Sequence, residues 1–495
     1  MILLKSANIV DGTGKPAYRA DVLIKDDRIS AIGTFTPKPG DEVIDALGMT
    51  LTPGFIDINT DSDHYLTLFS NPEQQDFLLQ GVTTIVGGQC GSSLAPLFYG
   101  SLKSVRKWGN ISQVNVDWHA VGELRDILRK RGLGVNFTTL IGHSTVRRDL
   151  VGEEIRDLTD SEFDIFTRTI EQGMREGARG LSAGLGYVHA RNVSPAELER
   201  LLKTVAQKNG LYTTHLRDER AGVFDGVKET LDLAEKVNIP TVISHLRPIV
   251  GFEEPFRDSI ALLNDTTHAR NVYFDANPFT FSIMPIYTLL PGWAQHKNFE
   301  EMADVLRNPD HRERIKNDLI QSGADFGPMV IAEARGNNAI VGKTVGEFAA
   351  SRELPVVDAL LALMDITKLE SLITESNINR ELLEETLFHP RALIGSNTAS
   401  FAPRADIVKS ERSTSTFPRY LALAQKRGEP FEESIARITG MPARLLRLEK
   451  RGTVTEGAYA DIGLYRDGSL THLLVNGNFA VRDGAVQPKK SGKAL

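Results

Sequence analysis

Residues 54–66 have the sequence GFIDINTDSDHYL, a short apolar run followed at once by a cluster of polar residues. The apolar run predicts the end of a buried strand, and side chains alternate in direction along a strand. Asn59 and Asp61 are two positions apart, so both side chains are expected to point to the same, inward side. This stretch therefore predicts a polar site at the end of a first strand.

The middle of the chain repeats this pattern. Short apolar runs alternate with helix-like stretches about every 30 residues, which is typical of βαβ units. Eight such runs are the number that a closed (β/α)₈ barrel requires. They occupy residues 51–59, 83–89, 135–142, 180–185, 212–216, 241–246, 272–277 and 392–397. The sequence therefore predicts an α/β fold, a TIM-like (β/α)₈ barrel.

The segments between the runs carry helix signals. Residues 194–210, SPAELERLLKTVAQKNG, place Ser194 as the cap, Pro195 at the first helical position and Glu197 where it completes a capping box. Residues 223–240, VFDGVKETLDLAEKVNIP, repeat the pattern, with Pro240 opening the next strand. These signals predict helices that connect successive barrel strands.

Both ends of the chain alternate in short bursts, with turn dipeptides such as the NG and DG of residues 473–484, LLVNGNFAVRDG. We expect residues 1–50 and 447–495 to pair into one small β-sandwich domain around a barrel at residues 51–446. The interval between the seventh and eighth runs is about four times the usual spacing. It predicts an inserted helical lid or subdomain at residues 285–345, over the active site.

Composition narrows the class of protein. The chain has 495 residues, a net charge of −7 and a pI near 5.9. This charge gives no basic field for nucleic acid, so a small-molecule substrate is expected. No run approaches the length of a membrane span, and the single cysteine fits a reducing compartment, so we expect a cytoplasmic location. An oligomer is compatible with the sequence but does not follow from it.

Three metal-binding residue types stand at the predicted strand ends, where barrel enzymes place their catalytic groups. These are Cys90 after the second run, His215 in the fifth and His245 in the sixth. A lone cysteine or core histidine is more often a packing residue. A Cys/His/His set around one axis instead suits one tetrahedral Zn²⁺, with the fourth position left for water.

The sequence also resembles the N-acyl-D-amino-acid deacylases, the D-aminoacylase branch of the metal-dependent amidohydrolases. The resemblance covers nearly the whole chain and is carried by pieces such as LTPGFIDINTD (51–61), TTIVGGQCGSSLAP (83–96), YTTHLRDE (212–219), VISHLR (242–247), HPRALIGSN (389–397) and TFPRYL (416–421). It implies a (β/α)₈ barrel with a β-sandwich, and zinc on Cys90, His215 and His245. The bridging carboxylated lysine of many amidohydrolases has no candidate in GLSAGL (180–185), which favours the cysteine-based site.

Three residues, at two strand ends, depart from the pattern of this family. Its first strand normally ends in His-x-His, where this chain has Asn59 and Asp61, and its eighth in Ser-Asp, where this chain has Ser396 and Asn397. The family's aspartate acts as the general base, and an amide cannot accept that proton. General acid–base help is worth about 10²–10⁴-fold, so the change predicts a slow deacylase unless another group has taken over.

Candidates for that group lie in the opening stretch. Asp61 could ligate a metal or act as the base, because strand geometry points it inward. Asp63 and His64 could reach the pocket through a bent loop, with His64 as a catalytic candidate. Polar clusters after strands are more often solvated loop residues, which is the alternative interpretation of these two.

Substrate contacts are predicted at three further positions. Arg217 and Arg247 each lie two residues after a histidine of the metal set, and either could bind a carboxylate bidentately or form a surface salt bridge. Tyr187, in GLGYV (184–188), matches a family tyrosine near the scissile carbonyl, and core packing is its alternative role.

The leading hypothesis is a zinc-dependent amidohydrolase that acts on a C–N bond other than a peptide, such as that of an N-acyl (D-)amino acid. The alternative is a catalytically silent member of the family with a binding or regulatory role, because loss of a base and two ligands together is what relaxed catalytic demand produces. A third possibility is changed chemistry, such as a lyase-like or deaminating step on a related substrate.

Overall fold

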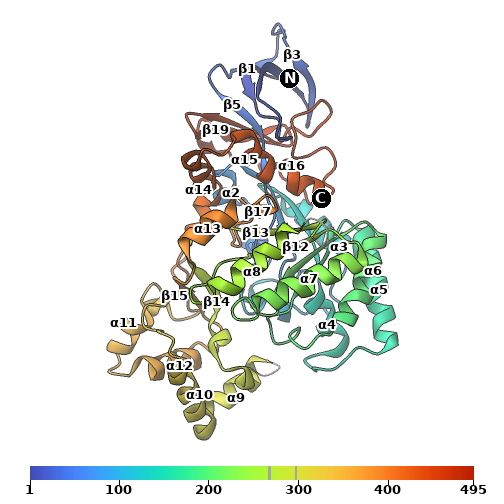
Figure 1. The fold of residues 1–495 in the computed structure, drawn as a ribbon. Helices are drawn as coiled ribbons and strands as arrows, with labels where there is room; N and C mark the ends of the chain where they lie inside the picture. Colours follow the sequence, from blue (N-terminus) through green and yellow to red (C-terminus); the bar gives the residue numbers. More distant parts are fainter. Residues whose placement is uncertain (266–268, 296–297) are drawn as a thin grey trace.

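The structure is a computed structural model that describes residues 1–265, 269–295 and 298–495. It has three parts: a β-rich part that contains strands from both ends of the chain, a central part of strands and helices, and a helical part at the opposite end (Figure 1). The central part lies between the other two.

One nine-stranded sheet contains strands from both chain ends. Its N-terminal strands are β1 (Ile2–Ile9), β2 (Tyr18–Lys25), β3 (Arg28–Gly33), β4 (Glu42–Asp45) and β5 (Thr50–Pro53). Its C-terminal strands are β18 (Ile462–Arg466), β19 (Ser469–Val475), β20 (Asn478–Arg482) and β21 (Ala485–Val486). The two sets join where β18 pairs antiparallel with β5. Buried side chains from both ends, among them Leu4, Leu51 and Ile462, pack into one apolar cluster.

Parallel strands form the centre of the molecule. The strands β6 (Phe55–Asp57), β7 (Val82–Gly87) and β8 (Asn136–Thr139) pair in this order in one sheet. A second sheet contains, in order, β9 (Ile141–Gly142), β10 (Gly180–Gly184), β11 (Leu211–His215), β12 (Thr241–Ile243), β13 (Val272–Ala276) and β17 (Ala392–Ile394). Only Leu140 separates β8 from β9, so the chain passes directly from one sheet to the other.

Hydrogen bonds join the first parallel strand to the last. Asn397, just after β17, donates its backbone N–H to the carbonyl oxygen of Asn59, just after β6, at 2.8 Å. The backbone N–H of Ser396 donates to Oδ1 of Asp57 at 2.9 Å. Strand order, strand direction and these contacts give a fold of the TIM-barrel type, in which all carboxyl ends of the strands face the same side.

The first predicted run, residues 51–59, is divided between two sheets. Thr50–Pro53 pairs with β18, whereas Phe55–Asp57 pairs with β7. Gly54 stands at the division, and a Cβ there would lie 2.2 Å from the side chain of Thr83. Because only glycine fits this approach, the chain can cross directly from one sheet to the next. The terminal sheet therefore extends past the boundary predicted at residue 50.

Helices connect the parallel strands and pack beside them (Figure 1). They are α1 (Thr67–Ser70), α2 (Gln75–Leu78), α3 (Val121–Arg131), α4 (His143–Val151), α5 (Asp160–Arg175), α6 (Pro195–Gln207), α7 (Val223–Val237), α8 (Glu253–Asn264), α13 (Arg380–Leu387), α14 (Arg412–Arg427), α15 (Phe431–Ile438) and α16 (Gly440–Leu445), with the 3₁₀ turns η1 (Lys103–Val105) and η2 (Ile111–Gln113). The predicted Ser194 cap is confirmed. The predicted capping box is wrong, because the Glu197 carboxylate instead pairs with His143 and Arg147 in the interior.

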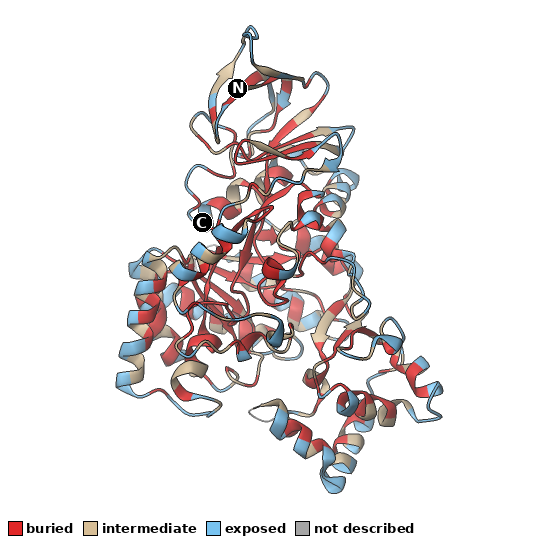
Figure 2. Cartoon of the chain, turned by 180° about the vertical axis from the view of Figure 1, so that it is seen from behind, coloured by how far each residue is buried: buried red, intermediate tan, exposed pale blue. Residues whose placement is uncertain are grey.

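A helical segment lies between β13 and β17. It begins after β14 (Ser282–Pro285) and ends before β16 (Leu372–Glu375), and these strands form a separate antiparallel sheet with β15 (Val330–Glu333). Its helices are η3 (Ile286–Leu289), η4 (Gly292–Ala294), α9 (Phe299–Arg307), α10 (Pro309–Gln321), η5 (Asn338–Ile340), α11 (Val345–Ala350) and α12 (Val356–Ile366). Their buried side chains form a core of their own, with exposed residues outside (Figure 2). The segment runs beyond residue 345 because α12 supplies much of that core.

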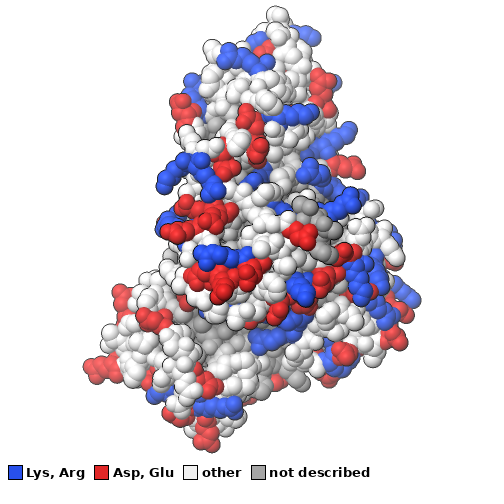
Figure 3. Space-filling view, in the orientation of Figure 1, with Lys and Arg blue, Asp and Glu red and all other residues white. Residues whose placement is uncertain are grey.

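Acidic and basic side chains are interspersed over the face shown in Figure 3. Within the described ranges, every helix falls short of the length and hydropathy that crossing a membrane demands.

Candidate metal centre and active site

Cys90, His215 and His245 come together at the carboxyl ends of β7, β11 and β12. Sγ of Cys90 lies 3.4 Å from Nε2 of His245, and Nδ1 of His215 lies 3.0 Å from the same Nε2. The three donor atoms all lie within 4.8 Å of one another, and no other such group of three occurs among the described residues. This convergence suits a zinc site with three protein ligands and an open position.

The backbone at this cluster is unusual. The φ angles of Cys90 and His245 are 51° and 40°, in the left-handed region that residues other than glycine seldom occupy and that recurs at functional sites. Gly184, at the end of β10, packs against this backbone, and a Cβ on it would lie 2.1 Å from the carbonyl oxygen of Cys90. The backbone of Cys90 therefore occupies the space that a lysine side chain at residue 184 would need.

Glu219 holds the two histidines from the side away from Cys90. Its Oε1 accepts a hydrogen bond from Nδ1 of His245 at 2.8 Å, and its Oε2 lies 3.9 Å from Nε2 of His215. This bond leaves Nε2 of His245 facing Cys90, as when a carboxylate orients a metal-binding imidazole. Sequence analysis missed Glu219, although its position four residues after His215 was a usable signal.

The charges of the cluster are compatible with a cation. Burial lowers the pKa of His215 to about 3, so this imidazole is neutral and can act as a ligand. Burial also raises the pKa of the Cys90 thiol. For His245 burial acts in the opposite direction, but Glu219 and Cys90 outweigh it and raise the pKa to about 10. Zinc binding would displace the protons of Cys90 and His245, because thiolate and neutral imidazole are the ligand forms. The residues present therefore fit a zinc ion.

The cluster lines a cavity of about 260 Å³. Residues 282–285 and 288–289, from β14 and the start of the helical segment, line the same cavity. All predicted site residues except Asp63 and His64 are found in its wall, namely Cys90, His215, His245, Asp61, Asn397, Tyr187, Arg217 and Arg247. The tertiary structure therefore brings together residues spread over more than half of the chain.

Asp61 lines the cavity, and its carboxylate contacts a buried histidine. Its Oδ1 lies 2.9 Å from Nδ1 of His64, whose Nε2 donates to the carbonyl oxygen of Ser92 at 3.0 Å. Burial disfavours the charged imidazole, but Asp63 and Asp61 outweigh it and raise the pKa of His64 to about 9. His64 and Asp63 are both 0% exposed, so the interpretation of these residues as solvated loop residues is wrong.

Asn59 stands at the first position of the His-x-His pattern. It is not part of the group formed by Cys90, His215 and His245. Its Nδ2 donates to both carboxylate oxygens of Asp275, at 3.2 and 3.1 Å, and both residues are buried. Burial raises the pKa of Asp275 to about 6. A hydrogen-bonded amide–carboxylate pair therefore stands where the family pattern has a metal ligand.

Asn397 lines the cavity at the junction between the first and last parallel strands. Its φ angle is 48°, in the left-handed region that asparagine tolerates better than most residues. Its amide can donate and accept hydrogen bonds but cannot take up a proton. Asn397 therefore lines the site but cannot act as a base.

Arg217 is occupied by partners within the protein. Its Nε and Nη2 donate to the two oxygens of Glu229 at 3.1 and 2.7 Å, and Nη1 and Nη2 donate to the backbone carbonyls of Arg191 and Val193. These contacts favour a structural role for Arg217, although it lines the cavity.

Two other arginines retain free donors. Arg247 donates Nη2 to Glu219 at 2.7 Å, but its buried Nε has no hydrogen-bond partner among the described residues. Arg412, the first residue of α14, is 1% exposed, and its Nε and Nη1 also have no partner in the described part of the chain. Both residues line a small cavity beside His245. Sequence analysis missed Arg412, because a buried arginine on a distant helix has no local signature.

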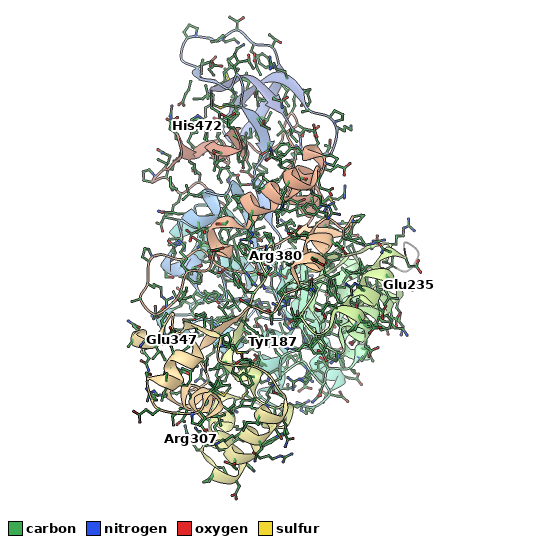
Figure 4. The ribbon with its side chains drawn as sticks, turned by 60° about the vertical axis from the view of Figure 1, so that its left-hand side comes forward. Tyr187, Glu235, Arg307, Glu347, Arg380 and His472 are labelled. Atoms are coloured by element: carbon green, nitrogen blue, oxygen red, sulfur yellow. The ribbon has the colours of Figure 1, made fainter. Side chains whose placement is uncertain are left out.

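Tyr187 forms a wall of the cavity. Its ring centroid lies 4.7 Å from that of His215, and Nζ of Lys107 lies 4.1 Å from the same tyrosine ring. Burial raises the pKa of Tyr187 well above its ordinary value, so the phenol is neutral and can donate a hydrogen bond. Figure 4 labels Tyr187, which lies close to the helical segment.

Parallel strands of the TIM-barrel type with a Cys/His/His group at their carboxyl ends define a scaffold of the metal-dependent hydrolase class. Comparisons with known proteins narrow this class, although no family model matches the chain. The chain is 27% identical to the D-aminoacylase of Alcaligenes xylosoxydans xylosoxydans over 474 residues, 94% of this chain and 87% of that protein. It is 26% identical to the N-acyl-D-aspartate deacylase of the same organism over 477 residues, 95% of this chain and 86% of that protein.

Solved structures give the same result for the fold. A crystal structure of D-aminoacylase, described as defining a novel subset of amidohydrolases, matches with a TM-score of 0.82 at 23% identity, over 100% of this chain and 99% of that one. Another D-aminoacylase structure, described by the role of its binuclear metal centre with one-metal activation and second-metal attenuation, matches with a TM-score of 0.80, at the same identity and over the same shares of the two chains. The chain is a homologue of the N-acyl-D-amino-acid deacylases, and the resemblance predicted from the sequence is confirmed.

Proposed function

We propose that this protein is a zinc-dependent deacylase that hydrolyses the amide bond of an N-acyl-D-amino acid. The observation that carries the proposal is the convergence of Cys90, His215 and His245 in one cavity with Asp61. The three clustered residues would hold one zinc ion, and Glu219 would orient His245. When bound, Zn²⁺ supplies Lewis acidity, which activates water and polarises a carbonyl oxygen. The names of the two relatives support the choice of substrate class.

Asp61 carries the proton transfer in this proposal. Water adds to the acyl carbon, the C–N bond breaks, and the products are a carboxylate and a free amine. Asp61 accepts a proton from the attacking water and returns it to the leaving nitrogen, the role that Asn397 cannot perform. His64 is a positioning residue, because its contact with Oδ1 fixes the carboxylate at the cavity wall. Asp61 acts as a base in this scheme because it lies outside the donor group.

One metal is sufficient for the proposed reaction. Asn59 is bonded to Asp275, so the first position of the His-x-His pattern supplies no metal ligand. The D-aminoacylase described by one-metal activation and second-metal attenuation supports activity with a single ion. The altered residues are therefore compatible with an enzyme.

The substrate carboxylate has a matching site. Arg247 and Arg412 line a small cavity beside His245, and each has buried donors without a partner among the described residues, which a bidentate contact would satisfy. Converting the carboxylate of a substrate to a carboxamide should raise KM about 10-fold or more, since hydrogen bonds to charged groups are the stronger ones.

The proposal also includes a division of the chain into domains. The parallel strands close into a (β/α)₈ barrel within residues 54–446, and residues 1–53, which include β5, form the terminal β-domain with residues 447–495. The helical segment, which the packing extends to about residues 282–375, covers the cavity as a lid. The hydrogen bonds between the ends of β6 and β17 support closure of the barrel.

Metal content and a substrate panel test the proposal. Protein purified without added zinc should contain about one equivalent of zinc, and it should hydrolyse one or more N-acetyl or N-formyl D-amino acids in preference to the L-forms. Near-zero zinc would contradict the metal site. Full zinc with no hydrolysis across the D- and L-panel would instead favour the catalytically silent alternative.

A further inference from the structure

A second cavity of about 190 Å³ adjoins the proposed active site. Its wall combines the loop after β7, the helix α4, the loop after β10 and the start of the helical segment. Tyr187 lines both this cavity and the one that contains the metal cluster, our name for the proposed metal-binding residues Cys90, His215 and His245. The two cavities therefore share a wall residue, whose ring centroid lies 4.1 Å from Nζ of Lys107 and 4.7 Å from the ring centroid of His215.

The wall of the second cavity has an excess of positive charge. Its cationic residues are Lys103, Arg106, Lys107 and Arg148, and its acidic residues are Glu153 and Glu300. Arg106 is paired with Glu300 at 2.7 Å and with Glu370 at 2.8 Å. Arg148 lies 3.5 Å from Glu153. Lysines 103 and 107 are left without a carboxylate within ion-pair distance among the described residues.

Among the cations that line the second cavity, Lys107 contacts Tyr187, with Nζ 4.1 Å from the ring centroid. Within the described ranges its Nζ donates to two uncharged oxygens, Oγ of Ser92 and the carbonyl of Ser104, both at 3.2 Å. Burial and the charge of Arg148 lower the pKa of Lys107 to about 7, and a bound anion would favour the charged form. The buried Nε of Arg148 has no hydrogen-bond partner in the described part of the chain. A ligand anion would satisfy both groups.

The position of this cavity identifies the part of the substrate that reaches it. Arg247 and Arg412, the proposed carboxylate site, lie on the side of β12 and β13. Tyr187 follows β10, which lies on the opposite side of β11 from β12, and Lys107, in the loop after β7, lies against the Tyr187 ring. In an N-acyl amino acid the acyl chain extends from the scissile carbonyl away from the amino-acid carboxylate. It therefore points toward Tyr187 and Lys107.

We propose that the second cavity is a subsite for an anionic acyl group, so that the preferred substrates are amides between an amino acid and a dicarboxylic acid of four or five carbons, such as N-succinyl or N-glutaryl amino acids. This inference rests on the proposed deacylase function. The reaction is the same hydrolysis: water adds across the C–N bond and releases the dicarboxylate and the free amino acid. Lys107 and Arg148 bind the distal carboxylate, and Tyr187 separates it from the metal cluster.

The test compares N-succinyl-D-leucine with N-butanoyl-D-leucine. The acyl chain ends in a carboxylate in the first compound and in a methyl group in the second. The wild-type kcat/KM should be about 10-fold or more higher for the succinyl substrate, since a charge-assisted contact is gained. Lys107→Met should lower kcat/KM about 10- to 100-fold for the succinyl substrate and leave the butanoyl value within about twofold. Lys107→Arg should retain most of the preference. Lys203→Met, at an exposed lysine on α6, is the matched control and should change neither value.

Other outcomes separate this inference from the proposed function. Hydrolysis of the butanoyl substrate as fast as the succinyl one, or an equal loss on both in Lys107→Met, would overturn the subsite and leave the deacylase intact. If neither compound is hydrolysed, calorimetric titration of the zinc-loaded protein decides. Tighter binding of the succinyl compound that depends on Lys107 supports the subsite, and equal binding of the two compounds overturns it.

Discussion

The two sides of the site differ in how their polar groups are satisfied. On one side, Cys90, His215 and His245 place three donor atoms within 4.8 Å of one another. On the other, Asn59 donates to both oxygens of Asp275, and Asn397 has an amide where the family pattern has a base. The first side can bind a cation, whereas the second is closed by a hydrogen-bonded pair. The comparison teaches that a group of metal-binding residue types can lie beside a hydrogen-bonded amide–carboxylate pair in one site, with the carboxylate of Asp61 in the same cavity.

Removing a ligand from the metal-binding side should have the largest effect. Cys90→Ala should reduce the zinc content from about one equivalent to near zero and abolish hydrolysis, because two imidazoles alone do not make a three-ligand site. Elemental analysis of the purified variant measures the zinc content. Asn59→Ala, on the other side, is the control and should retain the metal. Full zinc in Cys90→Ala would show that the cluster is not the metal site.

Exchanging the two candidate bases should have the next largest effect. Asp61→Asn should lower kcat about 10²–10⁴-fold with zinc content unchanged, because it removes the proton acceptor and leaves the ligands. Asn397→Asp should raise the rate of the wild type and restore part of the rate of Asp61→Asn. Steady-state kinetics on the best N-acyl substrate measure both. Loss of zinc in Asp61→Asn would instead identify Asp61 as a ligand.

Glu219→Gln should weaken the metal site more modestly. The substitution removes the charge that orients His245, and changes of this kind cost about 10- to 100-fold in metal affinity. Competition with a chromophoric chelator measures the zinc Kd. Glu229→Gln, which alters the partner of Arg217 outside the cluster, is the matched control and should leave the Kd within about twofold. An unchanged Kd in Glu219→Gln would show that His245 needs no carboxylate for its orientation.

The smallest effect should come from Asp57, at the junction between β6 and β17. We expect it to make the stability of the protein depend on pH. Burial raises the pKa of Asp57 to about 7, so the folded state binds a proton that the unfolded state releases near pH 4. The stabilisation is complete below about pH 4 and is lost as the pH rises through about 7, at up to about 1.4 kcal/mol per pH unit. Asp57→Asn should remove this dependence.

Denaturant unfolding of the wild type and Asp57→Asn at pH 5 and pH 8 tests this point. The free energy of unfolding of the wild type minus that of Asp57→Asn should be larger at pH 5 than at pH 8. A difference that does not vary with pH would show that Asp57 does not titrate in this window.

Much of the fold was predictable because its signals are local. The helix after Ser194 begins where its cap and proline predict, and the parallel strands coincide with the apolar runs, although β7 and β11 begin one residue earlier. The Cys90–His245 contact joins residues 155 positions apart, yet it was predictable. Parallel strands of this fold type bring all their carboxyl ends to one side, so residue types at strand ends indicate which side chains can meet.

Other features depended on side-chain directions that no period in the sequence encodes. The Asn59–Asp275 pair joins residues 216 positions apart, and its form depends on which way each side chain turns. The same holds for the burial of His64 and for Arg412, which reaches the site from α14.

The sequence by itself determined the alternation of strands and helices, the β-rich ends and the set of cysteine and histidines, because backbone periodicity and residue type are local properties. Only the tertiary structure decided that Glu219 orients His245, that His64 holds Asp61, and that Lys107 lies one tyrosine ring from the metal cluster. These contacts depend on how loops from separate strands pack against one another, and that packing is a property of the whole chain.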